Sequence, residues 1–239
     1  MPRHTPSFLL LINTMARLIY TSSSQTVITE YAMRQNSFSD RLLSRFLISS
    51  STQGSKVMCL LHCFRDERCV SFTFKKANSG CRLHGVCFSK PSDAPLSPGT
   101  ELFYLSRAIG YIGYPCGSNT DCKTPTSTCN AGVCDCEIGY SFSVNDRGCV
   151  RHCSSYGTDF TAYIERGLRD TNTFRDWGYS EEACLGLCTS ESGYLCLTVE
   201  RYPADGFCTL THATWFDVAA TDRDTAAYGY VMYHRNCAL

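Results

Sequence analysis

The alternation of apolar and polar positions predicts a helix followed by a strand early in the chain. Residues 56–63, Lys-Val-Met-Cys-Leu-Leu-His-Cys, are typical of a helix, and Ser55 before them is a preferred N-cap residue. From Cys69 onward, Cys-Val-Ser-Phe-Thr-Phe alternates in polarity and is rich in strand formers. Because Cys59 and Cys63 stand at positions i and i+4, both thiols lie on one helix face and can point toward a sheet. The pattern therefore predicts an α+β layer of one helix on an antiparallel sheet.

The same pattern recurs later in the chain. Four cysteines of the first copy have counterparts in the second: Cys59 and Cys184, Cys63 and Cys188 at an offset of 125, then Cys69 and Cys196, Cys81 and Cys208 at an offset of 127. Ser180 takes the place of Ser55, and two acids follow it in the first helical turn, where the helix dipole favours them. Each copy ends in an aromatic, strand-like run, at residues 103–105 and 228–233. One module is therefore expected to occur twice.

Two further cysteines belong to the second copy alone. Cys153 stands at its start and Cys237 at its end, and the first copy lacks both equivalents. Because they are absent together, we expect them to bond to each other.

A segment of different character separates the copies. Six cysteines fall within 34 residues that show little hydrophobic periodicity: Cys116, Cys122, Cys129, Cys134, Cys136 and Cys149. A segment this small needs cross-links, because it cannot bury a sufficient core. Residues 88–101, which contain three prolines, are expected to form a loop, and residues 109–114 a short linker.

Cysteine content points to an oxidising compartment. The chain holds 17 cysteines, none before Cys59, and a cytosolic protein would keep so many thiols reduced. The odd number leaves at least one thiol free or bonded to another chain. The apolar run Phe8 to Ile12 behind Arg3 fits a secretory leader over residues 1–24, with a mispredicted first exon as the alternative. The chain is expected to be secreted or extracellular, with attachment to a cell surface left open.

The cysteine spacing resembles the PAN/apple module. The helix with two cysteines, the strand led by Cys69 or Cys196 and the Cys-x-Leu strand carry the likeness, in a four-cysteine form for residues 28–108 and a six-cysteine form for residues 153–239. The closing Tyr-His-Arg-Asn-Cys also looks like the end of that family. The resemblance implies the pairs Cys184–Cys208 and Cys188–Cys196 and, by the internal repeat, Cys59–Cys81 and Cys63–Cys69.

The middle segment, residues 115–150, is similar to an EGF-like or EB module. Its six cysteines and the run Cys-Asp-Cys-Glu-Ile-Gly-Tyr from Cys134 carry this likeness. The resemblance implies the pairs Cys116–Cys129, Cys122–Cys134 and Cys136–Cys149. The calcium-binding subtype places acids just before its first cysteine, and residues 111–115 contain none, so no cofactor is expected. Cys87 is left unpaired; a buried free thiol, an intermolecular disulfide and a rearranged pairing are the alternatives.

Catalytic chemistry finds no support in the sequence. A zinc site drawn from Cys59, His62, Cys63 and His84 lacks the paired knuckles of structural zinc sites. The chain has no Cys-x-x-Cys redox motif, no Gly-x-Ser-x-Gly elbow, no phosphate loop and no dinucleotide fingerprint. We therefore do not expect an enzyme.

Charge and aromatic residues favour binding. Residues 1–108 hold 13 Lys/Arg against 6 Asp/Glu, and residues 153–239 hold 6 against 12, so net charge is zero but polarised. The basic candidates on the first module are Arg65, Arg68, Lys75, Lys76, Arg82 and Lys90, which would suit an anionic glycan or form an ordinary solvated face. The second copy offers aromatic residues for sugar or protein contact, or for its core: Trp177, Trp215, Tyr228, Tyr230 and Tyr233. Zero net charge argues against nucleic acid.

The expected function is extracellular recognition or adhesion, because PAN/apple modules bind proteins or carbohydrates. The alternative from another class is a structural matrix or secretion component that is cross-linked through Cys87 as a disulfide-linked dimer. A third hypothesis is a regulator that docks to a serine protease.

Overall fold

The computed structural model describes residues 15–21, 27–89 and 95–239. The chain divides into two compact units, which we call unit 1 (Met1–Pro115) and unit 2 (Cys116–Leu239). The run Phe8 to Ile12 of the expected leader lies outside the described residues, whereas Met15–Thr21 forms a strand of unit 1. Among the described residues, no helix is long and apolar enough to cross a membrane.

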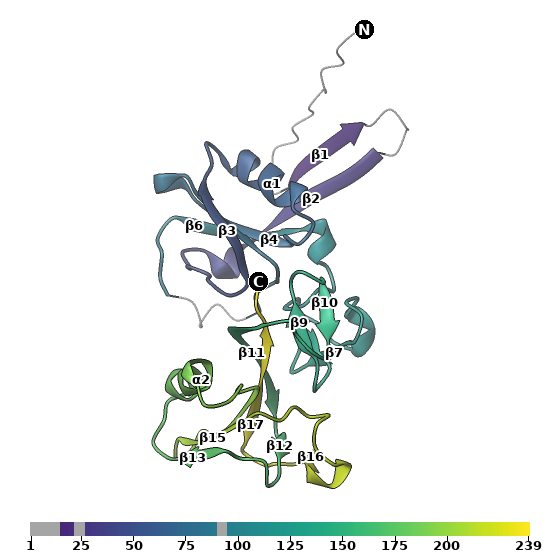
Figure 1. The fold of residues 1–239 in the computed structure, drawn as a ribbon. Coiled ribbons are helices and arrows are strands. Elements are labelled where there is room, and N and C mark those ends of the chain that lie inside the picture. The colour runs from purple at the N-terminus through teal and green to yellow at the C-terminus, as the bar shows by residue number, and fades with distance from the viewer. Residues whose placement is uncertain (1–14, 22–26, 90–94) are drawn as a thin grey trace. The chain divides into compact units, whose positions relative to one another are not determined.

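Over its described residues, unit 1 is an antiparallel sheet with one α-helix on one face (Figure 1). The strands lie in the order β1-β2-β6-β4-β5-β3. In chain order the described elements are β1 (Met15–Thr21), β2 (Val27–Gln35), β3 (Leu47–Thr52), α1 (Lys56–Arg65), β4 (Ser71–Lys75), β5 (Gly80–His84) and β6 (Thr100–Leu105), with short 3-10 turns at Asn36–Phe38, Lys76–Asn78 and Ser106–Ala108.

The core of unit 1 lies between α1 and the sheet. Ser55 caps the helix, because its Oγ accepts a hydrogen bond from Met58 N–H at 3.2 Å, which confirms the predicted N-cap. Phe72 of β4 stacks on Phe103 of β6 with 5.0 Å between ring centroids. The buried residues of this core are Ala32, Cys59, Leu60, Cys63, Cys69, Phe72, Phe74, Cys81, Leu83, Phe103 and Leu105. Each large side chain buried there stabilises the fold by about 1.5–3 kcal/mol.

Unit 2 contains the middle segment and a second helix-on-sheet layer. Its elements are β7 (Ser127–Asn130), β8 (Val133–Cys136), β9 (Ser141–Ser143), β10 (Gly148–Val150), β11 (Tyr156–Ile164), β12 (Gly167–Leu168), β13 (Phe174–Asp176), α2 (Glu181–Ser190), β14 (Thr198–Tyr202), β15 (Phe207–Thr211), β16 (Arg223–Asp224) and β17 (Val231–Cys237), with 3-10 turns at Asn119–Asp121 and Ala220–Asp222. The main sheet has the order β11-β17-β14-β15-β13, and α2 packs against β14 and β15.

The two sheets share one topology. The order β2-β6-β4-β5-β3 in unit 1 corresponds strand by strand to β11-β17-β14-β15-β13 in unit 2, and a helix follows β3 and β13 in the chain. Side chains repeat as well. Ser71 Oγ donates to Val86 O at 2.6 Å, and 127 residues later Thr198 Oγ1 donates to Ala213 O at 2.7 Å. The repeat in the sequence is therefore a repeat of structure.

Two sequence expectations about chain segments are wrong. The run 228–233 is only partly a strand, because β17 begins at Val231 and Gly229 turns the chain with a φ of 78°. Residues 109–114 are not a simple linker: Tyr111 and Ile112 are buried in unit 1, and Cys87 N–H donates to Ile112 O at 2.8 Å.

The middle segment packs on the second layer. Phe142 of β9 is 1% exposed, and its N–H donates to Asn236 Oδ1 of β17 at 2.8 Å. Tyr163 of β11 donates its hydroxyl to Cys136 O at 2.9 Å. A segment that cannot bury a core of its own thus gains one from its neighbour, in addition to its disulfides.

Candidate functional site

Eight disulfides cross-link the chain, two within unit 1 and six within unit 2. They join the pairs Cys59–Cys81, Cys63–Cys69, Cys116–Cys129, Cys122–Cys134, Cys136–Cys149, Cys153–Cys237, Cys184–Cys208 and Cys188–Cys196. In unit 1, Cys59–Cys81 fastens α1 to β5, and Cys63–Cys69 closes the loop after the helix. Each bridge contributes about 2–4 kcal/mol by restricting the unfolded chain. The scaffold is therefore rigid beneath any surface that it presents.

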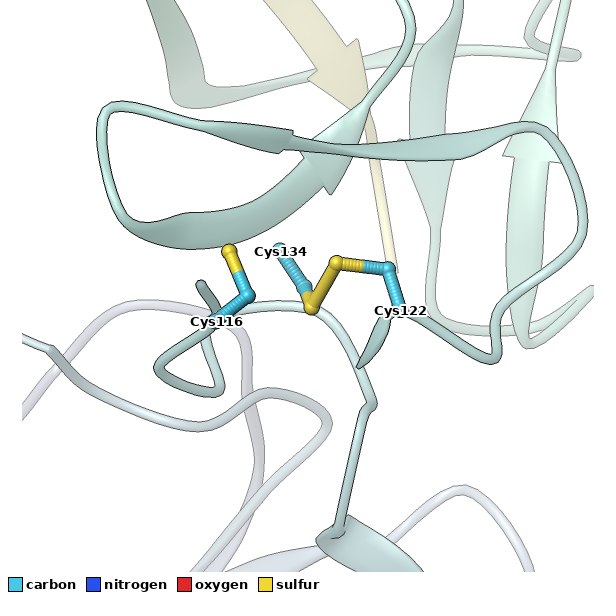
Figure 2. Close-up of side chains that lie close together, drawn as sticks. All are labelled: Cys116, Cys122 and Cys134. Atoms are coloured by element: carbon cyan, nitrogen blue, oxygen red, sulfur yellow. A yellow bond between two sulfur atoms is a disulfide. The ribbon is translucent and has the colours of Figure 1, made fainter. Parts of the chain in front are cut away.

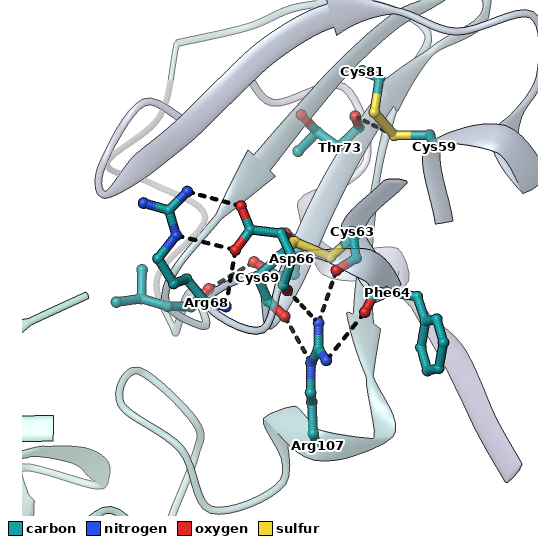
Figure 3. The surroundings of a disulfide bond; sticks show 11 residues. Cys59, Cys63, Phe64, Asp66, Arg68, Cys69, Thr73, Cys81 and Arg107 are labelled. Carbon is teal, nitrogen blue, oxygen red and sulfur yellow. Dashed lines mark hydrogen bonds and ion pairs between the residues drawn. A yellow bond between two sulfur atoms is a disulfide. The ribbon is translucent and has the colours of Figure 1, made fainter. Parts of the chain in front are cut away.

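An arginine completes the C-terminal end of α1 (Figure 3). Arg107 Nη2 donates to Cys63 O at 2.8 Å and to Asp66 O at 2.7 Å, while its Nε donates to Cys69 O at 2.8 Å. The last carbonyl groups of a helix have no partner within the helix, so the guanidinium satisfies them and adds a favourable charge there.

Unit 2 solves the same problem with a different residue. Arg235 Nη1 donates to Cys188 O at 3.5 Å and to Cys196 O at 3.1 Å, and its Nε donates to Gly157 O at 2.6 Å. Arg107 follows the last strand of its sheet, whereas Arg235 lies within β17. This pair of arginines was not predicted from the sequence, where one arginine beside the end of each copy was the signal available. Both have structural positions, so neither is a ligand-binding candidate.

The five basic candidates that the structure describes do not form one patch. Arg65 and Arg68 lie at the C-terminal end of α1, where Arg68 pairs with Asp66 at 2.9 Å and holds the pKa of that carboxyl below its usual value. Lys75 is the last residue of β4, about 13 Å along the strand from its first residue, and Lys76 follows it. Arg82 projects from the sheet face opposite α1, since Cys81 beside it faces the helix, and its Nη1 donates to Leu43 O. Lys90 lies outside the described residues.

The cysteine clusters hold no metal ligands. Figure 2 shows Cys116, Cys122 and Cys134, whose sulfur atoms lie within 4.8 Å of one another. All three belong to disulfides, and a disulfide sulfur is not the thiolate that binds zinc. The zinc set drawn from the first module fails for the same reason, because Cys59 and Cys63 are both bridged.

Cys87 is a buried free thiol. It is 3% exposed, its Sγ lies 3.5 Å from Ala108 O, and burial raises its pKa far above the ordinary value. A thiol in this position cannot reach another chain while unit 1 is folded. The structure therefore argues against the cross-linked dimer through Cys87.

A serine–histidine pair in unit 2 is structural. Ser141 Oγ lies 3.0 Å from His234 Nε2 and donates to Arg235 O at 2.9 Å. Both side chains are fully buried, and burial lowers the pKa of His234 to about 4. No substrate can reach this hydroxyl, so the pair joins the middle segment to β17 and does not act as nucleophile and base.

The aromatic candidates of the second copy separate into core and surface. Trp215 and Tyr233 are buried, at 7% and 5% exposure, and belong to the core. Trp177 is 58% exposed and Tyr228 is 76% exposed, whereas Tyr230 is half-buried. Exposed rings indicate an interaction site when they belong to a contiguous apolar patch.

Ring contacts join four aromatic side chains into one surface, which we call the aromatic patch: Trp177, Tyr202, Phe207 and Tyr230. Centroid distances are 5.0 Å from Trp177 to Phe207, 6.2 Å from Phe207 to Tyr230 and 5.1 Å from Tyr202 to Tyr230. Tyr202 and Phe207 face each other in register on β14 and β15. Neither residue was predicted from the sequence, where the turn signal Pro-Ala-Asp-Gly between them was the clue to this hairpin.

Two glycines permit this packing. Gly206 has a φ of 72°, and a Cβ there would lie 2.8 Å from Tyr179 N, so only glycine lets the two turns beside Trp177 approach each other. At Gly229 a Cβ would lie 2.4 Å from the ring of Tyr202. The patch is therefore built into the backbone, and its rings are held in place before any ligand arrives.

A buried carboxyl lies on the sheet face that carries the patch. Glu200 is 5% exposed; its Oε1 accepts a hydrogen bond from Leu168 N–H and its Oε2 accepts one from Thr209 Oγ1 at 3.2 Å. Burial raises the pKa of Glu200 to about 7, Asp224 adds to the rise, and Arg175 opposes it. This group links β14 to β12, which pairs with β16, the strand before the turn that carries Tyr230.

Comparisons with known proteins find a family likeness for part of the chain. Residues 34–107 match the family model described as the PAN domain. No curated protein sequence matches the chain. Among solved structures, the chain is similar to the two N-terminal apple domains of Toxoplasma gondii microneme protein 4 in solution, with 10% identity, a TM-score of 0.26 and coverage of 83% of this chain and 89% of that one. Residues 34–107 of unit 1 are thus similar to a PAN domain, in a disulfide-rich α+β chain of antiparallel sheets.

Proposed function

We propose that the protein is an extracellular recognition protein, not an enzyme, which binds protein or carbohydrate ligands through two PAN-like modules, residues 28–108 and 153–239. The matched PAN domain supports the first module, and the shared strand order and cysteine positions support the second. Three disulfides in the middle segment, residues 115–150, fit an EGF-like or EB module. The many bridges also favour secretion, since disulfides persist in oxidising compartments.

The aromatic patch carries the proposal. Rigid, partly exposed Trp and Tyr rings are the side chains that supply most binding energy at interfaces, because they bury large areas at little entropic cost. Asp176 and Asp205 lie beside Trp177 and Phe207 in the sequence, and residues 153–239 carry twice as many acidic as basic residues. The acidic excess of these residues favours a protein partner with a basic surface, with opposite charge guiding association.

Variants of one exposed ring test this function. Trp177→Ala should reduce binding of the fluorescently labelled chain to intact cells at least about tenfold, as loss of an interface anchor does. Leu195→Ala is the matched control, because Leu195 is 54% exposed but lies outside the patch. Glycosidase treatment of the cells separates a glycan from a protein partner, since it removes the glycan and leaves the protein. Equal binding by Trp177→Ala, Leu195→Ala and the natural chain would show that the patch is not the recognition surface.

A further inference from the structure

Unit 2 contains a cleft of about 430 Å³ between the middle segment and the second layer. Its lining residues are Thr128, Cys129, Asn130, Glu137, Ile138, Tyr163, Ile164, Arg166, Trp215 and Phe216. The volume lies within the ~300–1,000 Å³ of ligand pockets and suits a ligand of about one or two sugar rings. The cleft lies by β11, at one edge of the main sheet, whereas Trp177 of the aromatic patch follows β13 at the other edge. The two sites share no residue, although they adjoin at one point, where Glu165 N–H beside Arg166 donates to Tyr230 O at 2.8 Å.

The apolar part of the cleft is rigid. Tyr163 and Trp215 are 4% and 7% exposed and belong to one buried cluster, against which Ile138 and Phe216 pack. Tyr163 cannot turn away, because its hydroxyl donates to Cys136 O. These side chains offer ring and methyl surface to the apolar C–H face of a ligand.

The polar part presents fixed donors and acceptors. Arg166 Nη1 donates to Glu165 O at 2.9 Å and to Thr225 O at 2.7 Å, which holds the guanidinium in place while its Nε and Nη2 have no partner among the described residues. Asn130 Nδ2 donates to Ala162 O at 2.8 Å, so the amide is oriented with Oδ1 left to accept. Groups held in this way lose little entropy when a ligand binds.

The charges of the lining select the ligand class. Arg166 supplies donors, and Glu137, whose side chain is exposed, supplies an acceptor carboxylate of opposite charge. The two charges are opposite, so the net charge of the lining favours neither an anion nor a cation. Neighbouring hydroxyl groups that donate and accept at once satisfy both sides, and an apolar ligand would leave both charges unpaired.

We infer that this cleft is a binding site for a neutral pyranose sugar, held between the middle segment and the second PAN-like layer. The inference goes beyond the protein contact proposed for the aromatic patch, because it assigns a different ligand to a different surface. It also gives the middle segment a function: Thr128, Asn130 and Glu137 come from that segment, so neither part of unit 2 forms the site alone.

Saturation-transfer NMR of the whole chain with glucose, galactose, mannose, N-acetylglucosamine and N-acetylgalactosamine tests the inference. At least one sugar should bind saturably, with a dissociation constant on the order of 1 mM. Arg166→Gln should weaken that binding about tenfold, the usual loss for a hydrogen bond to a charged group. Arg175→Gln, an exposed arginine beside the other sheet edge, should leave it unchanged.

Further variants keep the test decisive. Arg166 also bonds to Thr225, so its replacement could change the fold as well as the cleft. Glu137→Gln is the second variant, because Glu137 is exposed and has no side-chain partner among the described residues. It should weaken sugar binding several-fold and leave the fold intact. Absence of binding by all five sugars would overturn the inference. Loss of sugar binding in Trp177→Ala, with Arg166→Gln and Glu137→Gln unaffected, would move the sugar to the aromatic patch and overturn it too. The cell-binding test of the aromatic patch is independent of this result, because it depends on Trp177 and not on sugar binding in the cleft.

Discussion

Replacing Glu200 by Gln should remove a pH-dependent term from the stability of unit 2. The glutamine side chain has the same shape, so its oxygen can still accept from Leu168 N–H, and its amide can donate to Thr209 Oγ1 in place of the present bond. What the substitution removes is the ionisable carboxyl, which is 5% exposed.

The sign follows from the pKa. Glu200 titrates at about 7 in the folded chain against an ordinary 4.5, because burial disfavours its charged form. The folded state therefore binds the proton more tightly than the unfolded state, and stability from this group is complete below pH 4.5 and lost as pH rises through 7. A difference of this size corresponds to about 3 kcal/mol. At pH 8, Glu200→Gln should be more stable than the natural chain by up to about that amount.

Tryptophan fluorescence is the assay, because both tryptophans of the chain, Trp177 and Trp215, lie in unit 2. Urea unfolding is followed at several pH values for the natural chain, for Glu200→Gln and for Glu165→Gln, an exposed glutamate that serves as control. Buried His234, with its pKa lowered to about 4, makes stability rise with pH over a similar range, so the difference between variant and natural chain isolates Glu200. A difference that does not grow between pH 5 and 8 would refute the reasoning.

Three further outcomes are expected. Arg235→Ala should destabilise unit 2 by about 2–4 kcal/mol in the same fluorescence assay, because buried carbonyl groups lose a charged donor. Arg169→Ala, which removes an exposed ion pair with Asp224, should lower the stability of unit 2 by less than about 1 kcal/mol. Cys87 should react with a thiol reagent only after unfolding, at one thiol per chain, and the protein should run as a monomer on a non-reducing gel; a dimer that Cys87→Ala abolishes would contradict its burial. Residues 153–239 alone should unfold at lower urea than residues 116–239, because they lose the contacts of Phe142, and equal midpoints would show that the middle segment is only a spacer.

The scaffold could be predicted because its determinants are local or repeated. Ser55 and the spacing of Cys59 and Cys63 specify where α1 begins and which face it buries, and a second copy with the same spacing makes coincidence improbable. The bridges Cys59–Cys81 and Cys184–Cys208 occupy the same place in both sheets. A pattern of this kind depends on sequence separation alone, which a single sequence displays.

The sites could not be predicted, because they depend on which side chains the fold brings together. Trp177 and Tyr230 were visible as aromatic residues, but their contact through Phe207 requires β13, β15 and the turn before β17 to be placed in space. The basic candidates show the converse: Arg65 and Lys75 look close in sequence, yet one lies at a helix end and the other at a strand end.

The repeat also explains why the two modules should bind different ligands. The positions 127 residues before Tyr202 and Phe207 are Lys75 and Gly80, and these two again face each other in register, on β4 and β5. Where one sheet carries two rings, the other carries an ammonium group, which donates to Ser97, and a bare backbone. The two cores have equivalent disulfides, whereas the side chains at this end of the hairpin differ. The two copies share a backbone arrangement at these positions but carry different side chains, as separate recognition surfaces require. A partner of the aromatic patch should therefore have no counterpart site on unit 1.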